Sequence, residues 1–170
     1  MAYRRALVTG GAGFIGSHVA DRLLQQGFHV AVVDNLSTGK LGNVSQSAAF
    51  YNVDIRSRKL VGVFRQEQPE VVFHLAAQAS VPSSIARPVE DARNNVLGSL
   101  NLLEQCKRYK VERFIYTSTG GALYGDPQQL PCAETDPIRP VSPYGASKFA
   151  AEVYVGGYAS LGGFQYSVLR

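Results

Sequence analysis

Two side chains near the C-terminal end of the sequence have the spacing of a proton-transfer pair. Tyr144 and Lys148 are four residues apart, which places both on one face of a helix. A neighbouring ammonium favours the ionised form of a phenol, whose ordinary pKa is about 10. Tyr144 is therefore a candidate general base near neutral pH, and Lys148 is the group expected to lower its pKa.

Three glycines near the N-terminus have the spacing of an anion-binding turn. Gly10, Gly13 and Gly16 follow the apolar run 6–8 and lead into apolar residues at helical spacing, an order that predicts strand, tight turn and helix. Gly10 would permit the turn, Gly13 the approach of a pyrophosphate, and Gly16 close packing of the helix on the sheet. The anion would then lie at the helix N-terminus, where free N–H groups and the positive dipole end meet.

An acidic residue indicates which anion this turn would bind. Asp34 follows the apolar run 29–33 and lies 18 residues after Gly16, where a carboxylate can accept a hydrogen bond from an adenosine ribose. No Lys or Arg follows until Lys40, so a 2′-phosphate would meet a carboxylate without an adjacent cation. The pattern favours NAD over NADP; the alternative is a glycine-rich turn followed by a helix-capping acid.

Polar or small residues follow three further predicted strands. They are Asp54 and Ile55 after the third strand, Leu75, Ala76, Ala77 and Gln78 around the end of the fourth, and Ser118 and Thr119 after the fifth. Parallel strands bring their carboxyl ends to one edge of a sheet. We therefore expect the first group beside an adenine, the second beside ribose and pyrophosphate, and the two hydroxyls beside a reacting ring.

Strands and helices alternate along the whole chain. Strands are predicted near 6–8, 29–33, 50–53, 71–75, 113–117 and 165–169, and helices after residue 13 and near 57–66, 89–109 and 144–161. This alternation predicts an α/β fold of the Rossmann type, with a doubly wound parallel sheet in the order 3-2-1-4-5-6 and helices on both faces.

Composition indicates one domain that binds neither nucleic acid nor membrane. The chain has 170 residues, 45% of them hydrophobic, which suffices for a single core, and no linker is evident. The formal net charge of +4 is spread along the chain rather than gathered in a stripe. The apolar run after Arg4 and Arg5 is too short for a signal sequence or a membrane span, so a cytoplasmic protein is expected.

The cysteines and histidines do not form a chemical pattern. Cys106 and Cys132 are 26 residues apart without metal-ligand spacing, which predicts two free thiols in a reducing compartment and no metal site. His18, His29 and His74 are isolated, and we expect them to satisfy local hydrogen bonds.

Taken together, the motifs resemble those of the extended short-chain dehydrogenase/reductases, and within them most closely those of the UDP-glucose 4-epimerases. The motifs are the glycines at 10, 13 and 16, the stretches 34–39, 54–55, 74–77, 94–98 and 118–125, and the pair Tyr144 and Lys148. The resemblance covers all 170 residues.

The resemblance implies a role for each matching residue. Gly10, Gly13, Phe14, Ile15 and Gly16 would hold the pyrophosphate of NAD, Asp34, Asn35, Ser37, Thr38 and Gly39 the adenosine ribose, and Asp54 and Ile55 the adenine. Leu75, Ala76, Ala77, Gln78 and Asn95 would line the rest of the cofactor site, and Lys148 would bond the nicotinamide ribose. Tyr144 would be the base, assisted by the hydroxyl of Thr119, with Ser118 as the alternative. The charge of an oxidised nicotinamide would add to that of Lys148 in lowering the pKa of Tyr144.

The implied reaction is the interconversion of UDP-glucose and UDP-galactose through a 4-keto sugar. Related dehydratases carry acidic residues where this chain has Gly120 and Gly121, so dehydration is disfavoured, while another epimerase or a 4-reductase remains possible. Family members continue beyond the strand 165–169 into a lobe that binds the nucleotide sugar. We therefore expect residues 1–170 to be the NAD-binding domain without that lobe, and the alternative is a non-catalytic NAD-binding module.

The resemblance also implies a protein partner. In the family, the helices near 89–109 and 144–161 form a four-helix interface between two copies of the chain. The alternative is that their apolar residues simply pack on the sheet.

Overall fold

A computed structural model describes residues 3–127 and 129–170. The strands are β1 (Arg5–Thr9), β2 (His29–Asp34), β3 (Ala49–Asn52), β4 (Val71–His74), β5 (Arg113–Thr117) and β6 (Gln165–Leu169). The helices are α1 (Phe14–Gln25), α2 (Leu60–Glu67), α3 (Val81–Ala86), α4 (Pro88–Ala92), α5 (Gly98–Arg108) and α6 (Pro143–Gly162). A 3-10 turn, η1 (Leu41–Asn43), and a π-turn, η2 (Arg93–Leu97), complete the regular structure of this part of the chain.

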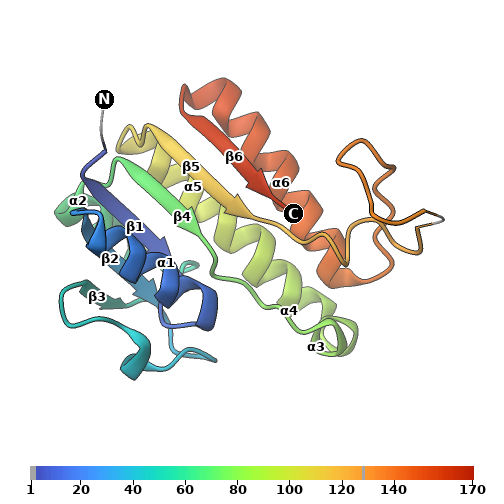
Figure 1. Ribbon diagram of the computed structural model, residues 1–170, viewed down its shortest axis with the longest axis horizontal. Coiled ribbons are helices and arrows are strands. Elements are labelled where there is room, and N and C mark those ends of the chain that lie inside the picture. Colours follow the sequence, from blue (N-terminus) through green and yellow to red (C-terminus); the bar gives the residue numbers. More distant parts are fainter. Residues whose placement is uncertain (1–2, 128) are drawn as a thin grey trace.

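The strands form one parallel sheet in the order β3-β2-β1-β4-β5-β6, which confirms the predicted order. Their carboxyl ends point toward the side where α3 and α4 lie (Figure 1). The central strands β1 and β2 are buried from their second residue onward. A parallel strand that is covered on both faces needs such a continuous apolar run.

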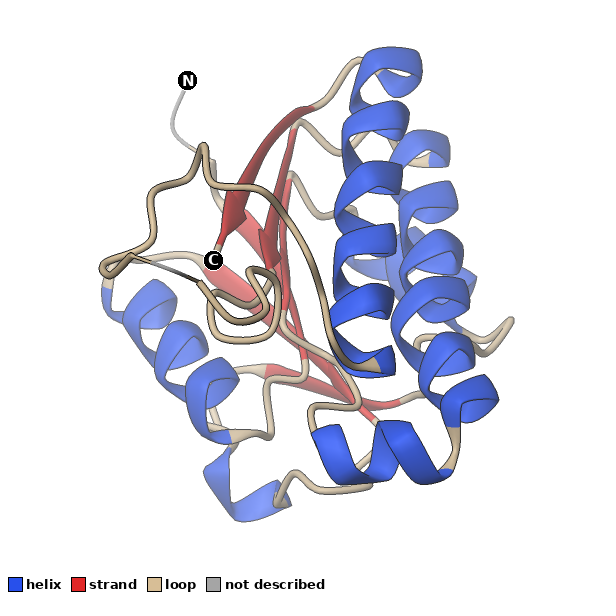
Figure 2. Cartoon of the chain, turned by 90° about the vertical axis from the view of Figure 1, so that its right-hand side faces the viewer, coloured by secondary structure: helices blue, strands red, loops and turns tan. Residues whose placement is uncertain are grey.

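Helices cover both faces of the sheet, as the sequence predicts. Apolar residues of α2, α5 and α6 share one cluster with one face, and those of α1 share a second cluster with the other. The view in Figure 2 shows two long helices side by side along one face of the sheet. No helix of the described residues is both long enough and apolar enough to cross a bilayer.

The region between β4 and β5 differs from the prediction. The strand near 71–75 ends at His74, and a short helix, α3, follows that the apolar pattern did not indicate. Ser80 caps α3 by accepting the N–H of Ser83, and Pro82 lies in its first turn. The predicted helix near 89–109 does form, but the π-turn η2 interrupts its α-helical hydrogen bonding. Such insertions are common at functional sites.

Candidate active site

The glycine turn after β1 is tightly packed against the end of β4. Gly10 has φ +72°, and a Cβ added to it would lie 2.7 Å from the backbone nitrogen of Ala76. A Cβ added to Gly16 would lie 2.2 Å from the carbonyl oxygen of Gly10. Both positions therefore require glycine, Gly10 for its left-handed backbone and Gly16 for the close approach of α1.

The N-terminus of α1 keeps unpaired donors. Gly13 is the N-cap and has no side chain to accept a hydrogen bond. The first hydrogen bond of the helix runs from the N–H of Ser17 to the carbonyl of Gly13 at 3.0 Å. The N–H groups of Phe14, Ile15 and Gly16 precede it and so have no partner within the helix, which makes this end suited to an anion.

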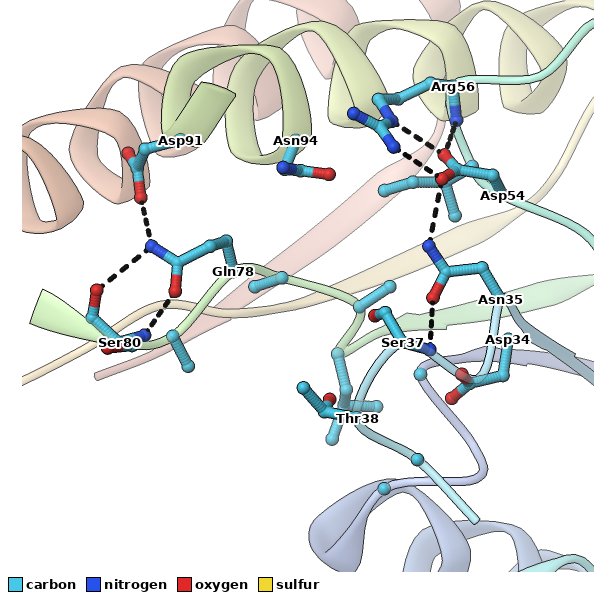
Figure 3. Close-up of a pocket in the computed structure, with 18 of the residues that line it drawn as sticks. Asp34, Asn35, Ser37, Thr38, Asp54, Arg56, Gln78, Ser80, Asp91 and Asn94 are labelled. Carbon is cyan, nitrogen blue, oxygen red and sulfur yellow. Dashed lines mark hydrogen bonds and ion pairs between the residues drawn. The ribbon is translucent and has the colours of Figure 1, made fainter. Parts of the chain in front are cut away.

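A cavity of about 760 Å³ opens at the carboxyl ends of the strands. Thirteen of the residues expected at the cofactor site line it: Gly10, Gly13, Asp34, Asn35, Ser37, Thr38, Gly39, Asp54, Ile55, Leu75, Ala76, Ala77 and Gln78. They come from the ends of β1, β2, β3 and β4 and gather around one space (Figure 3). The cavity has the size and mixed lining of a small-molecule site.

Asp34 ends β2 with its carboxylate held by backbone N–H groups. Oδ2 accepts the N–H of Ala12 at 3.0 Å, and Oδ1 accepts the N–H of Leu36 at 2.8 Å. The side chain is largely buried and lines the cavity. Each carboxylate oxygen has a second lone pair, so Asp34 can still accept a ligand hydroxyl.

A polar network surrounds the end of the cavity that the sequence assigns to adenine. Asp54 accepts a hydrogen bond from Nδ2 of Asn35 at 2.9 Å and forms an ion pair with the guanidinium of Arg56 at 2.8 Å, as Figure 3 shows. The hydrogen bonds from Arg56 lower the pKa of Asp54 to about 2. Arg56 also pairs with Glu90 of α4 at 2.5 Å, which links the turn after β3 to α4.

The other end of the cavity lies against α4 and η2. Gln78 Nε2 donates to Oδ1 of Asp91 at 2.8 Å and to the carbonyl of Ser80 at 3.0 Å (Figure 3). Oδ2 of Asp91 is buried without a hydrogen-bond partner among the described residues. The negative charge of Asp91 favours the charged form of the nearby Lys148.

Six residues expected at the cofactor site do not line the cavity: Phe14, Ile15, Gly16, Asn95, Tyr144 and Lys148. Gly16 packs beneath the glycine turn, and the side chains of Phe14 and Ile15 are 80% and 59% exposed. Asn95 is only 1% exposed and lies behind the residues that line the cavity. It exchanges hydrogen bonds with the backbone of Gln78 at 2.8 and 3.0 Å and donates to Ser147 of α6 at 3.0 Å. Its neighbour Asn94 lines the cavity instead.

The expected proton-transfer residues lie at the start of α6 and after β5. Ser142 caps α6 by accepting the N–H of Gly145 at 3.1 Å, with Pro143 in the first turn. Ser118 donates to Glu152 of α6 at 3.0 Å, whereas the hydroxyl of Thr119 lowers the pKa of Tyr144. The two neighbouring hydroxyls therefore have different partners on the same helix.

Burial is the largest influence of the chain's own groups on the pKa of Tyr144. Burial raises it above its ordinary value, Asp91 raises it further, and the hydrogen bond with Thr119 lowers it. Lys148 is turned into the interior, with Nζ 4.4 Å from the centre of the Tyr116 ring. Burial lowers the pKa of Lys148 to about 8, while Asp91 and Glu152 favour its charged form. Lys148 is not among the described groups that shift the pKa of Tyr144, and the expected lowering also depends on the charge of an oxidised nicotinamide.

Sequence reasoning missed Arg56, Glu90 and Asp91, which border the cavity. Arg56 follows Asp54 by two residues, so a basic residue beside the expected adenine position was a visible signal. Glu90 and Asp91 lie in the helix before Asn95, and only the crossing of α4 with α6 and with the turn after β3 brings them to the site.

Comparison with protein-family models identifies one family. The model described as the NAD dependent epimerase/dehydratase family matches residues 6–170. A curated UDP-glucose 4-epimerase from Mycolicibacterium smegmatis is 44% identical over 162 residues, which are 92% of this chain and 52% of that protein.

Solved structures agree with this result. A Thermotoga maritima UDP-glucose 4-epimerase with UDP-glucose is 49% identical, with a TM-score of 0.95 over 97% of this chain and 54% of that one. A Thermus thermophilus UDP-glucose 4-epimerase in complex with NAD is 50% identical, with a TM-score of 0.94 over 98% of this chain and 54% of that one. The chain spans about half the length of these relatives.

Proposed function

Because the chain belongs to the NAD dependent epimerase/dehydratase family, we propose that it is the NAD-binding part of a UDP-sugar 4-epimerase. The observation that carries this proposal is the carboxylate of Asp34, held by two backbone N–H groups at the edge of the cavity, beside the uncapped N-terminus of α1. A ribose hydroxyl and a pyrophosphate fit these two features. Residues 1–170 then act as one NAD-binding domain, which the single sheet and its shared core support.

The chain's own groups fit NAD better than NADP. A Cβ at Gly10 would meet the backbone of Ala76, so glycine there lets the turn pack closely on the end of β4 beside the proposed pyrophosphate site. Asp34 accepts a ribose hydroxyl but repels a 2′-phosphate. When bound, NAD would supply hydride acceptance from the sugar carbon and hydride return. Orientation and proton transfer belong to the protein.

Tyr144 is the proposed group that takes and returns the proton of the sugar 4-hydroxyl. The hydroxyl of Thr119 lowers the pKa of Tyr144 and so favours its phenolate. Lys148 lies one helical turn further along α6 and holds a positive charge between Asp91 and Glu152. Ser118 is engaged by Glu152 and holds the end of β5 on α6.

The substrate class follows from the relatives. The Thermotoga maritima relative is described with UDP-glucose, and a Methanobrevibacter ruminantium relative, a UDP-N-acetylglucosamine 4-epimerase, is described with UDP-N-acetylmuramic acid. We therefore infer a UDP-sugar as the substrate of the whole protein.

Two copies of the chain are proposed to pair through α5 and α6. Leu97, Val153, Tyr154 and Leu161 are 57%, 60%, 45% and 79% exposed, an apolar set on and beside two neighbouring helices. Sedimentation velocity of the purified chain tests this directly. A dimer that Val153→Glu weakens supports the proposal, and a monomer at all concentrations contradicts it.

Calorimetric titration of the chain with NAD, NADP and UDP-glucose tests the proposed function. We expect NAD to bind and NADP to bind at least about tenfold more weakly, since an added phosphate would face Asp34. Absence of NAD binding would overturn the proposal. Chromatography of UDP-glucose incubated with the chain and NAD then separates an active epimerase, which forms UDP-galactose, from a module that binds NAD without turnover.

A further inference from the structure

His74, the last residue of β4, is a buried imidazole that the proposed proton transfer does not use. It is 1% exposed, and both ring nitrogens contact side-chain hydroxyls. Nδ1 lies 2.7 Å from Oγ1 of Thr9, and Nε2 lies 2.8 Å from Oγ of Ser99. His74 therefore joins the end of β1 to the first turn of α5.

The second partners of these hydroxyls decide which nitrogen carries the proton. Ser99 Oγ donates to the carbonyl oxygen of Asn95 at 2.6 Å, and Thr9 Oγ1 accepts the N–H of Ala76 at 3.3 Å. A hydroxyl has one proton, so Ser99 meets His74 as an acceptor and Nε2 donates. Nδ1 then accepts the proton of Thr9. Only this neutral Nε2–H tautomer gives each of these protons an acceptor within the described residues.

A continuous series of hydrogen bonds results, with every donor pointing the same way. It runs from the N–H of Ala76 through Thr9, His74 and Ser99 to the carbonyl of Asn95. The side chains of Thr9, His74 and Ser99 are at most 1% exposed, so water does not compete for these bonds.

Both ends of the series reach the walls of the cavity. Ala76 lines the cavity and packs against Gly10. At the other end, the side chain of Asn95 holds the backbone of Gln78 and the hydroxyl of Ser147 on α6. A change at the centre of the series would therefore act on the glycine turn, on the wall 75–78 and on α6 together.

We propose that His74 is a positioning residue for the dinucleotide site: as a neutral bridge, it keeps the glycine turn, the wall 75–78 and α6 in fixed positions relative to one another. This inference rests on the proposed function for the identity of the ligand. The hydrogen-bond series belongs to the chain whatever the cavity binds.

The surroundings of His74 favour the neutral ring. Burial, and then the charge of Lys148 on α6, lower the pKa of His74 to about 3. The rings of Phe114 and Tyr116 on β5 lie 5.9 and 5.7 Å from it, centre to centre. Protonation would bring a second cation near Lys148 and would leave the hydroxyl proton of Thr9 without its acceptor.

Long-range proton–nitrogen NMR spectra of the chain, recorded without cofactor, test the tautomer. We expect His74 to show a slowly exchanging Nε2–H and an unprotonated Nδ1, both unchanged between about pH 5 and 8. His18 and His29, whose side chains are more exposed, provide comparison signals in the same spectra. A proton on Nδ1, or protonation of the ring within this range, would overturn the inference.

Substitution of Thr9 tests the positioning role. Thr9→Val removes both the donor to His74 and the acceptor for Ala76, so the amide signal of Gln78 should shift and NAD affinity should fall about tenfold or more. Thr9→Ser keeps the hydroxyl and should restore both to near the unsubstituted values. Ser99→Ala removes the hydroxyl that accepts from Nε2 of His74. It provides the same test if Thr9→Val does not fold.

The outcomes separate the two proposals. Unchanged Gln78 signals and unchanged NAD affinity in a folded Thr9→Val chain would contradict the role of His74, as would equal losses in Thr9→Val and Thr9→Ser. If the unsubstituted chain does not bind NAD, the proposed function fails, while the tautomer and the Gln78 signal still decide the role of His74.

Discussion

Single polar side chains at this site are held mainly by the backbone and by other side chains, away from water. Asp34 accepts two backbone N–H groups, Asn95 bonds the backbone of Gln78, and His74 lies between two hydroxyls. Bonds of this kind fix the direction in which a carboxylate or an imidazole points. Substitutions at these residues should therefore change binding or proton uptake more than they change the fold.

Removal of the carboxylate of Asp34 should weaken NAD binding. Asp34→Ala should lower the affinity by about 10- to 100-fold, because a charged hydrogen bond to a ribose hydroxyl contributes on the order of 1.5–3 kcal/mol. Calorimetric titration measures this change. Asp21→Ala, which removes an exposed acid from α1, is the matched control and should leave the affinity unchanged. Equal effects of the two substitutions would contradict the assigned role of Asp34.

The buried His74 should make the fold sensitive to acid. Its pKa is about 3 in the folded chain and about 6.5 in an unfolded one. Between these values the unfolded state binds more protons, so the contribution of His74 to stability is complete above about pH 6.5 and is lost as the pH falls toward 3. The free energy of unfolding should fall by up to about 1.4 kcal/mol for each pH unit in this range.

Urea unfolding at a series of pH values measures this slope. His74→Gln cannot titrate, so its stability should fall less steeply below about pH 6.5. His18→Gln, on the exposed side of α1, should keep the steeper slope of the unsubstituted chain. The expectation fails if His74→Gln and the unsubstituted chain have the same slope.

At the scale of elements, the glycine turn and the helix that follows it act as one unit. The N-terminus of α1 can face a ligand only because α1 approaches the backbone of Gly10 closely at Gly16. The other wall depends on η2, since Asn95 lies within that π-turn and reaches both Gln78 and α6. Helix packing and an irregular helical turn thus set the two sides of the cavity.

A methyl group at Gly16 should separate α1 from the turn. Its Cβ would lie 2.2 Å from the carbonyl oxygen of Gly10, so Gly16→Ala should destabilise the chain by about 1–3 kcal/mol through overpacking. Gly62→Ala, in α2, has no atom within 4 Å of the added Cβ. It should be neutral or stabilising by up to about 1 kcal/mol, because Ala favours helix over Gly. Urea unfolding measures the free energy of unfolding of both variants. If Gly16→Ala leaves that free energy unchanged, α1 can move away from the turn without loss of stability.

The whole domain should respond to cofactor as one cooperative unit, because strands from both halves of the sheet supply the cavity. At an NAD concentration of about 100 times Kd, binding should add about 2.7 kcal/mol to the stability of the folded state. For a domain of this size, that gain corresponds to a rise in Tm of about 5–10 °C.

Thermal unfolding followed by circular dichroism measures this rise. NADP at the same concentration should give a smaller rise, and Asp34→Ala should remove most of the response to NAD. A single transition is expected throughout. If NAD shifted only part of a two-step transition, the cavity and the rest of the sheet would be separate units.

Much of the domain's architecture follows from the sequence. Buried parallel strands need continuous apolar runs, and the runs at β1 and β2 predict strands that the structure shows to be buried. β5 and β6 appear at their predicted bounds, and the strand order follows from the alternation of strands and helices. The positions of Gly10 and Asp34 at strand ends are local properties of the same kind. They predicted a ligand site at the carboxyl edge, and the structure brings both to one cavity there.

Other features depend on contacts between distant parts of the chain. The π-turn η2 and the short helix α3 have no periodic signature, and Asn95 lies behind the cavity wall because of that turn. The different partners of Ser118 and Thr119 follow from the crossing of β5 with α6, which residue spacing alone does not specify.

The sequence alone also did not determine the pKa values of the side chains at the site. Spacing placed Lys148 near Tyr144 and predicted a lowered pKa for the phenol once an oxidised nicotinamide is bound, whereas among the chain's own groups burial and Asp91 raise this pKa. Burial and the approach of charges from other helices exist only once the chain is folded. The sequence by itself determined the order of the strands, the glycine turn and the acid of the proposed ribose site. The tertiary structure decided which side chains are in contact and how burial and neighbouring charges shift their pKa values, because both depend on residues that are distant in the sequence.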